Sequence, residues 1–400
     1  MNSNYDIIVI GNGMVGASIS CALSAMPLRI AIVDQHLRRI TSAAPVLSDG
    51  RKIALSFGSC KILEQLRIWQ HCAKSVSAIQ QVQISRKNTF GVVRIDAEAM
   101  HVASMGYVIA AEKLQQALDI TLQKYKTIDW FEQAILTAID LGKHNTIHIK
   151  QNERQQTLSA KLIIAADGVL SPSRRLLNIP IVEKDYQQTA LVASIQVTQA
   201  TTPIAYQRLL GDAVLAMLPM QGQRYGVVYT APTTKTKALL ALDDAALLNE
   251  LQQQFGYRLG RLKQLGKRFT YPLKMIIAER QTKPGFVLLG NAAHTISPIA
   301  AQGFNLALQD IYCLYRLLQT HSNDYDLALN LYRQQRQQEQ QRIIDFTDRL
   351  TRYYSIDHGL LAAAALIGTD LLPNIKRHFA QLGMGLTPQV QTLLRTSYVT

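Results

Sequence analysis

The segment PGFVLLGNAAHTISPIAAQGFNLALQD, residues 284–310, combines residue types that can build a binding floor for a flavin. Its apolar run 286–289 ends at a glycine and Asn291, as expected of a buried parallel strand that leads into a turn. Pro298 then interrupts the chain, and Gly303 opens a helix with a periodic apolar side. The start of a helix carries unpaired amides and partial positive charge, which suits negative charge on the pyrimidine edge of a reduced flavin. A strand, loop and helix without a ligand is the alternative.

A glycine-rich turn near the amino terminus, GNGMVG, predicts a dinucleotide site. Residues 6–10 form the predicted strand before it, and a helix is expected over 14–25. In this setting Gly11 makes the tight turn, Gly13 lets a pyrophosphate approach, and Gly16 allows helix and strand to pack closely. A glycine-rich turn that binds nothing is the other interpretation.

Two carboxylates and an arginine favour FAD over NAD at such a site. Asp34 ends a second predicted strand, residues 29–33, and is positioned to accept hydrogen bonds from a ribose. Asp167 ends the strand expected over 161–166, which must lie beside the first strand and so brings this carboxylate to a cofactor hydroxyl. Arg51, in RKIALS, is a candidate contact for phosphate or for the central chain of the flavin. The ordinary alternatives are a simple Asp-Gly turn and a solvated arginine.

The composition is that of a globular protein of two or three interleaved domains, with 400 residues and 48% hydrophobic content. The formal net charge of +14 favours anionic partners, but the basic residues are scattered, which argues against nucleic-acid binding. Four cysteines without paired spacing fit free thiols in a reducing compartment. The amino terminus is interpreted as the first strand, not as a targeting signal.

We expect a cytoplasmic protein, because no stretch of the sequence is long and apolar enough to cross a bilayer. The nearest candidate is GLLAAAALIGTDLL, residues 359–372. It is a candidate for peripheral contact with the inner face of the cell membrane. Docking on the protein's own core or on a second subunit is the alternative, and the oligomeric state stays open.

Taken in order, GNGMVG, RKIALS, AADGVLSPSRR and GNAAHTISPIAAQGFNLALQD resemble the motifs of single-component FAD-dependent aromatic hydroxylases. Within that group the chain is most similar to the hydroxylases of ubiquinone biosynthesis, and the resemblance runs across most of the chain. It implies an α/β fold like that of p-hydroxybenzoate hydroxylase. Such a fold has a Rossmann-like FAD-binding domain, an interleaved β-sheet substrate domain and C-terminal helices.

The pattern of predicted elements divides the chain in the same way. The FAD-binding domain is expected to comprise residues 1–70, 97–180 and 276–320. The substrate sheet is expected over residues 76–96 and 181–275, and the C-terminal helical region over residues 321–400. Candidate strands of the substrate sheet are residues 191–197, 214–218, 225–229 and 268–272. A single helix is expected over 239–255 and a long one over 325–355, whose run RQQRQQEQQR is interpreted as a solvated face.

The resemblance implies roles for individual residues. The glycine turn and Asp34 would contact the adenosine and pyrophosphate of FAD, and Arg51 and Asp167 its phosphate and ribityl region. Asn291 would lie beside the ribityl chain. The full candidate set is Gly11, Gly13, Met14, Val15, Gly16, Asp34, Arg51, Asp167, Gly290, Asn291, Pro298, Gly303, Phe304 and Asn305, of which Pro298 and Gly303 would act in catalysis by positioning the flavin edge.

Asn291 departs from the wider family, most of whose members have aspartate there. Asparagine can still bond a ribityl hydroxyl, but it removes a charge beside the pyrophosphate. The Gly-Asn-Ala-Ala form resembles the branch that hydroxylates 2-polyprenyl-6-methoxyphenol, whereas members that act at other ring positions more often keep Gly-Asp-Ala-Ala. The resemblance therefore implies that branch.

We identify no acid/base set in the sequence, which fits a reaction whose hard chemistry the cofactor carries. His294 is expected to be a hydrogen-bonded structural residue, and no metal constellation is recognised. The resemblance implies that FAD, reduced by NAD(P)H as a transient reductant, reacts with O2 to form a C4a-hydroperoxide that hydroxylates a polyprenylated phenol. Candidates for an apolar channel that holds the prenyl tail are Ala216, Met217, Leu218 and Met220, with core packing as the alternative.

Three other functions stay open at this point. The chain could hydroxylate another ring position or a soluble aromatic compound. It could reduce isoprenoid double bonds with the same cofactor. It could also be a flavin-bound scaffold within a protein assembly for quinone biosynthesis.

Overall fold

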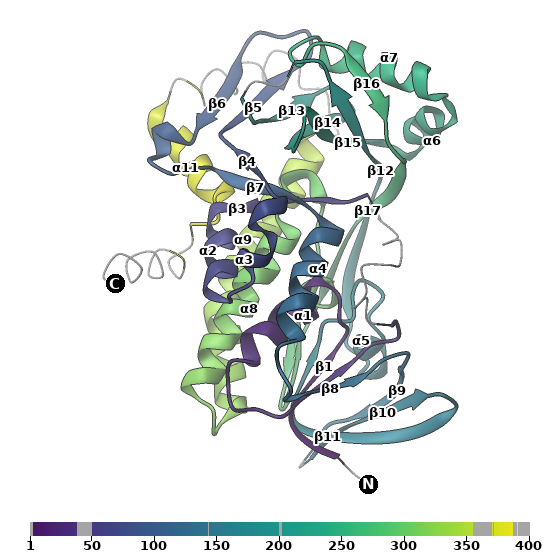
Figure 1. The fold of residues 1–400 in the computed structure, drawn as a ribbon, viewed down its shortest axis with the longest axis vertical. Coiled ribbons are helices and arrows are strands. Elements are labelled where there is room, and N and C mark those ends of the chain that lie inside the picture. Colours follow the sequence, from purple (N-terminus) through teal and green to yellow (C-terminus); the bar gives the residue numbers. More distant parts are fainter. Residues whose placement is uncertain are drawn as a thin grey trace.

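A computed structural model describes residues 3–37, 50–142, 144–199, 202–354, 370, 372–386 and 390. The first sheet has the order β18-β19-β11-β1-β2-β8, with β10 and β9 continuing from β11 (Figure 1). Its central strands are parallel, as predicted for a dinucleotide-binding sheet. The strands are β1 (Ser3–Ile10), β2 (Ile30–Val33), β8 (Ile128–Phe131), β9 (Ile135–Asp140), β10 (Asn145–Gln151), β11 (Arg154–Ala165), β18 (Thr282–Lys283) and β19 (Phe286–Leu288).

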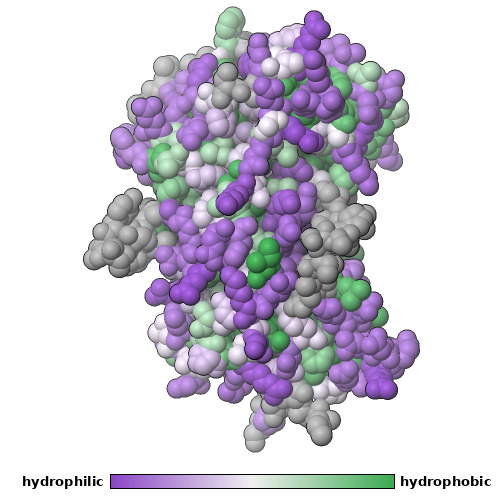
Figure 2. Space-filling model, viewed as in Figure 1, coloured by the Kyte–Doolittle hydropathy of each residue, from purple (hydrophilic) through white to green (hydrophobic). Residues whose placement is uncertain are grey.

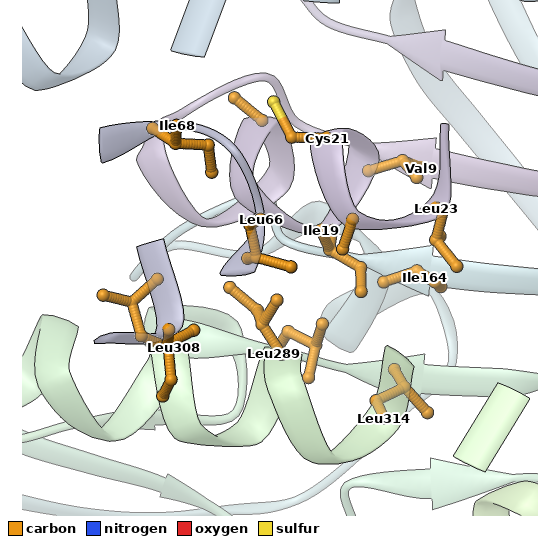
Figure 3. Close-up of a cluster of buried hydrophobic side chains, with 14 of the residues drawn as sticks. Val9, Ile19, Cys21, Leu23, Leu66, Ile68, Ile164, Leu289, Leu308 and Leu314 are labelled. Carbon is orange, nitrogen blue, oxygen red and sulfur yellow. The ribbon is translucent and has the colours of Figure 1, made fainter. Parts of the chain in front are cut away.

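Strand β1 is apolar on both sides because both faces of this sheet are covered. Ile7 and Val9 point into the core shared with helices α1 and α8, which Figure 3 shows in part. Ile8 and Ile10 point into a second core, closed by β9 and β10. Helices on the first side are α1 (Met14–Leu23), α2 (Phe57–Gln65), α3 (Trp69–Cys72), α4 (Ala111–Leu122), α8 (Gly303–Thr320) and α9 (Tyr325–Tyr354).

The second sheet has the order β20-β17-β12-β15-β14-β13-β5-β6, with β16 beside β12. It lies at the opposite end of the molecule from the first sheet in Figure 1, and its long strands β12 and β17 run toward the first sheet. Its strands are β5 (Gln81–Arg86), β6 (Val92–Asp96), β12 (Ile181–Val197), β13 (Ile204–Leu209), β14 (Val214–Met220), β15 (Arg224–Pro232), β16 (Leu262–Leu265), β17 (Phe269–Ala278) and β20 (His294–Thr295).

Smaller elements join the two sheets. A three-stranded sheet contains β3 (Lys52–Ser56), β7 (Gly106–Ala110) and β4 (Ser77–Ile79). The short helix α5 (Pro172–Leu176) follows β11, and α11 (Pro373–Gly383) lies near β5 and β6 in Figure 1. Single 3-10 turns are η1 (Ala73–Ser75), η2 (Glu98–Met100), η3 (Gly290–Ala292) and η4 (Pro298–Ala300).

The four strands predicted for the substrate sheet are confirmed as parts of β12, β14, β15 and β17. The single helix predicted over 239–255 is wrong, because the chain forms α6 (Thr233–Ala241) and α7 (Asp244–Phe255). Leu242 is extended between them, and the Asp243 carboxylate accepts the Ala246 N–H at 2.7 Å. Aspartate at an N-cap starts a new helix.

The prediction of a solvated face for RQQRQQEQQR is also wrong in part. Arg336 and Gln340, one helical turn apart on α9, are only 2% and 4% exposed. They point toward α8, while Arg333 on the same helix is exposed. The repetitive sequence therefore forms a helix with buried polar residues on one side, which its composition does not indicate.

Hydrophilic side chains dominate the molecular face that Figure 2 shows, with hydrophobic residues scattered among them. Among the residues described, no helix combines the length and apolar character needed to cross a membrane. The predicted contact segment 359–372 lies, apart from its residues 370 and 372, outside the described residues.

Candidate active site

The glycine turn after β1 brings three segments into close contact. Gly11 has a φ of +96°, and a Cβ there would lie 2.6 Å from the carbonyl oxygen of Ala166. A Cβ on Gly16 would lie 1.8 Å from the Gly11 oxygen, so both positions require glycine for packing. A Cβ on Gly13 would meet nothing within 4 Å. Gly13 therefore borders open space at the start of α1, where the helix amides are unpaired.

The carboxylate of Asp34 organises the rim of this space. It accepts the Asn12 N–H through Oδ2, and the His36 N–H at 2.7 Å through Oδ1. A cavity of about 390 Å³ lies beside it. This cavity is lined on its other sides by Arg51, Gln115, Trp130 and Phe131 among others. A cavity lined by aromatic side chains and a carboxylate suits a nucleoside.

Asp167 follows the end of β11, which pairs with β1 through Ala165 and Ile10. Its Oδ2 accepts the N–H of Ser173 at 2.8 Å. Its Oδ1 is buried and has no hydrogen-bond partner among the described residues. A buried carboxylate oxygen without a partner is costly, so it fits an acceptor that a ligand hydroxyl would satisfy.

Arg174 braces the same turn against the segment after β19. Its guanidinium donates to the carbonyl oxygens of Val169 at 2.8 Å and Ala292 at 3.0 Å. Burial lowers the pKa of Arg174, and the nearby Asp167 charge opposes that effect. Arg174 was not among the predicted site residues, although its place soon after a strand and an aspartate was a usable signal.

The segment after β19 has the predicted turn and the predicted start of a helix, and we call it the floor. Gly290 has a φ of +58°, and a Cβ there would lie 2.7 Å from Cγ2 of Val15, so the floor sits directly against α1. Asn291 is exposed, and its carbonyl accepts the Thr295 hydroxyl at 3.1 Å. Pro298 begins η4, which ends at Ala301 with a left-handed φ of +52°.

Helix α8 starts at the end of this floor without a side-chain cap and without a charged residue in its first turn. The amide of Asn305 holds that start in place. It accepts the Ser56 N–H at 2.9 Å and donates to the oxygens of Ala54 at 2.9 Å and Ala301 at 2.7 Å. The side chain of Asn305 therefore ties α8 to β3, while a Cβ on Gly303 would meet only Ile296, at 3.8 Å.

A buried ionic cluster lies beneath the floor. His294 Nε2 is 2.8 Å from Asp310 Oδ2, and Arg336 Nε donates to Asp310 Oδ1 at 2.6 Å. Burial alone would raise the pKa of Asp310, but the Arg336 charge and the His294 hydrogen bond outweigh it and lower the pKa below its ordinary value. His294 is thus the hydrogen-bonded structural residue that was predicted. Asp310 and Arg336 were not among the predicted site residues.

A second cavity of about 810 Å³ joins these parts. It brings together most of the predicted site residues, namely Gly13, Met14, Val15, Arg51, Gly290, Asn291, Pro298, Gly303, Phe304 and Asn305. Asp34 lines only the smaller cavity, and Gly11, Gly16 and Asp167 are not among the lining residues of either cavity, although Ala166 and Gly168 line the large one.

The opposite wall of the large cavity is one face of the second sheet. Ala216 and Leu218 line it, as predicted for the channel. Met217 points to the other face and is fully buried against α6 and α7, so its predicted place in the channel is wrong. Met220 is not among the lining residues. The alternation of side chains along β14 explains the difference between Met217 and its neighbours.

The sequence pattern of the FAD binding domain family matches residues 4–347. This chain belongs to that family. Ubiquinone hydroxylase UbiL of Rhodospirillum rubrum is 28% identical, in an alignment that covers 98% of this chain and 92% of the relative. The 3-demethoxyubiquinol 3-hydroxylase of Escherichia coli is 26% identical, covering 86% and 87%.

The crystal structure of p-nitrophenol 4-monooxygenase PnpA from Pseudomonas putida has the same fold. It matches with a TM-score of 0.78 at 13% identity, covering 96% of this chain and 99% of that one. The predicted fold class and the predicted resemblance are confirmed. The chain is an FAD-dependent monooxygenase of the FAD binding domain family.

Proposed function

We propose that this FAD-dependent monooxygenase hydroxylates the aromatic ring of a polyprenylated phenol in ubiquinone biosynthesis. The observation that carries the proposal is the continuous cavity of about 810 Å³ between the flavin floor and the second sheet. One wall has the glycines and polar groups that suit a flavin, and the other is largely aliphatic. Relatives named as ubiquinone-pathway hydroxylases, similar over most of this chain, support the substrate class.

FAD fits the residues present. The open space at Gly13 leaves room for a pyrophosphate, and the unpartnered Asp167 oxygen offers an acceptor for a ribityl hydroxyl. Asp34, with its carboxylate on the smaller cavity, would hold the ribose of the adenosine. Asn291 and Gly290 would lie beside the ribityl chain, and Arg51 near phosphate. Met14 and Val15 complete this set at the first turn of α1, and Gly11 and Gly16 shape the turn from behind.

Bound FAD would supply the activation of O2 and the oxygen atom for the ring, with NAD(P)H as the proposed reductant. The protein's part is to position, to exclude water and to stabilise charge. The first turn of α8, with Gly303 and Phe304, would face the pyrimidine edge and offer unpaired amides to its negative charge. Pro298 would support the edge of the ring system. Asn305 would act indirectly, because its side chain is bonded to β3.

Among the described residues that line the large cavity, the titratable side chains are lysine, arginine and tyrosine. Within the described ranges, no aspartate, glutamate or histidine lines it, and its charged lining residues are Arg51 and Lys52. A closed, apolar pocket protects a reactive oxygen-transfer step from water and stray protons. The proposal therefore assigns the protein no proton-transfer residue.

For the ring position, we propose the reaction on 2-polyprenyl-6-methoxyphenol. The support is the Asn291 side chain, which lacks the charge that most of the wider family carries there. The test is to delete the gene and identify by mass spectrometry the phenol that accumulates. Accumulation of 2-polyprenyl-6-methoxyphenol is expected, and a more highly substituted intermediate would contradict this ring position.

The scaffold alternative is tested with Gly303→Val. The nearest protein atom to a Cβ there is 3.8 Å away, so the side chain fits the fold but enters the cavity. Gly142→Val is the control, since a Cβ at Gly142 meets nothing within 4 Å. We expect Gly303→Val to stop quinone synthesis while its melting temperature matches that of the control. Normal quinone synthesis by Gly303→Val would favour a scaffold.

A further inference from the structure

The second sheet presents one continuous face to the large cavity. Ala216 lies opposite Val228 on β15 and Gln207 on β13. Gln207 lies opposite Ile84 on β5, which pairs with Val93 on β6. Residues opposite one another in paired strands share a face, and all five line the cavity. The cavity therefore spans five neighbouring strand positions across the sheet.

The two ends of this face, taken along the direction of β14, have different neighbours. At the end near the flavin floor, called the near end, Val214 and Leu209 pack against Ile299 of η4, which belongs to that floor. At the far end, Leu218 belongs to a separate apolar cluster that includes Ala380 of α11. The four residue steps from Val214 to Leu218 along β14 correspond to about 13 Å of strand.

Polarity changes along the same path. At the near end, Val214 pairs with Thr230, and Thr230 shares a cross-strand row with Ala190 and Tyr271. Thr230 and Tyr271 line the cavity and bring hydroxyl groups to it. The far end is aliphatic apart from Gln207, which lies beside Ile84. We call it the tail wall and define it as Val82, Ile84, Val93, Ile95, Ala205 and Leu218, all of which line the cavity.

We propose that the tail wall is the subsite for the polyprenyl tail, so that the phenol ring lies at the near end between η4 and the Thr230 row. This inference rests on the proposed function. A substituted phenol has oxygen atoms that need polar neighbours, whereas an isoprenoid tail offers only apolar surface, and the gradient of the sheet face matches that order. Ala380 of α11 adds a small side chain to the wall's far side.

The test compares two adjacent valines on β6. Val93 is 2% exposed and belongs to the tail wall, whereas its neighbour Val92 points to the opposite face and does not line the cavity. Val93→Thr places a hydroxyl in the wall with almost no change in shape, and Val92→Thr is the matched control. The probes are 2-geranylgeranyl-6-methoxyphenol and its analogue with a methyl group in place of the tail.

Binding is measured by the change in visible absorbance of the oxidised, FAD-loaded enzyme, without reductant. We expect Val93→Thr to reduce the preference for the tailed over the methyl phenol about 10-fold, a typical effect of mismatched polarity in an apolar pocket. Val92→Thr should keep the wild-type preference. Ala205→Phe, which fills the wall with a ring, should reduce the preference further.

The outcomes separate the two proposals. If wild-type enzyme binds the tailed phenol more tightly but none of the variants changes the preference, the tail wall is wrong while the proposed function stands. If Val93→Thr weakens both phenols equally, the assignment of ring and tail ends is wrong. If wild-type enzyme shows no preference for the tailed phenol, the proposed substrate class itself fails.

Discussion

Single atoms without partners are the most specific signs of the ligand at the residue scale. The Oδ1 of Asp167 is buried without a partner among the described residues, although its Oδ2 accepts the Ser173 N–H. A folded protein rarely leaves a carboxylate oxygen in that condition. In the proposed FAD site, a ribityl hydroxyl would supply the missing partner. Asn305 shows the opposite arrangement, because its amide is already bonded to β3 and to Ala301.

Asp167→Asn separates these two roles of the carboxylate. The amide oxygen can still accept the Ser173 N–H, but the amide nitrogen cannot accept a ligand hydroxyl. We expect FAD affinity to fall about 10-fold or more, since one unmatched buried polar group costs about 1–3 kcal/mol. Fluorescence titration of the apoprotein with FAD measures this. Asp140→Asn, at an exposed carboxylate on β9, is the control, and an equal loss in both variants would refute the assignment.

At the scale of elements, the floor depends on how α8 is fixed to α9. Asp310 of α8 bonds both His294, at the end of the floor turn, and Arg336 of α9. All three side chains are at most 2% exposed, so the charges are shielded from water and must satisfy one another. The cluster therefore couples the flavin floor to the long helix.

Arg336→Met tests this coupling. Removal of Arg336 leaves the buried Asp310 carboxylate with His294 alone, and removal of one partner of a buried ion pair costs about 3–5 kcal/mol. We expect that loss of unfolding free energy in urea denaturation. Arg333→Met, at an exposed position one turn earlier on α9, should change it little. Similar losses in both variants would mean that the pair contributes nothing specific.

The same variant should show a defined pH dependence. In the folded wild type the pKa of Asp310 is lowered. The Asp310 carboxylate therefore contributes its full stabilisation above about pH 4, the pKa of aspartate in an unfolded chain. This stabilisation is lost as the pH falls through the pKa of the folded state. Without Arg336, the largest of the effects that lower this pKa is removed, so the pKa rises. The penalty of Arg336→Met should therefore be largest at neutral pH and shrink as the pH approaches 4. A pH-independent penalty, in urea titrations at several pH values, would contradict this.

The sequence was sufficient for local features and insufficient for distant pairings. The strand, glycine turn and helix around Gly13 follow from short-range rules, and so does the floor around Gly290. The pair between Asp310 and Arg336 joins two helices, and its arginine lies within a repetitive run whose pattern indicates only solvent exposure. The break at Leu242 was missed because the apolar spacing continues across it, so only the Asp243 cap marks the new helix.

On the scale of the whole molecule, the site exists only when distant segments meet. The large cavity takes lining residues from α1, β3, the floor, the second sheet and α11, which span most of the chain. The smaller cavity beside Asp34 extends the site toward the adenosine end. A ligand that occupies both cavities should therefore raise the unfolding free energy more than a ligand that occupies only one.

FAD and FMN distinguish the contributions of the two cavities to this stabilisation. FAD at 100 times its Kd should add about 2.7 kcal/mol to the unfolding free energy. FMN lacks the adenosine that the smaller cavity would hold, so at the same concentration it should raise the melting temperature less. Equal shifts, measured by calorimetry on the apoprotein, would show that the smaller cavity takes no part in cofactor binding.

The most direct test of the proposed function is whether an oxygen atom from O2 is incorporated into the phenol. Purified, FAD-loaded protein is given NAD(P)H, the geranylgeranyl methoxyphenol and ¹⁸O2, and the product is analysed by mass spectrometry. The account predicts a ring-hydroxylated phenol that carries one ¹⁸O atom, with little product from Gly303→Val and normal product from Gly142→Val. A product without ¹⁸O, or a reduced prenyl chain in place of a new hydroxyl group, would contradict it.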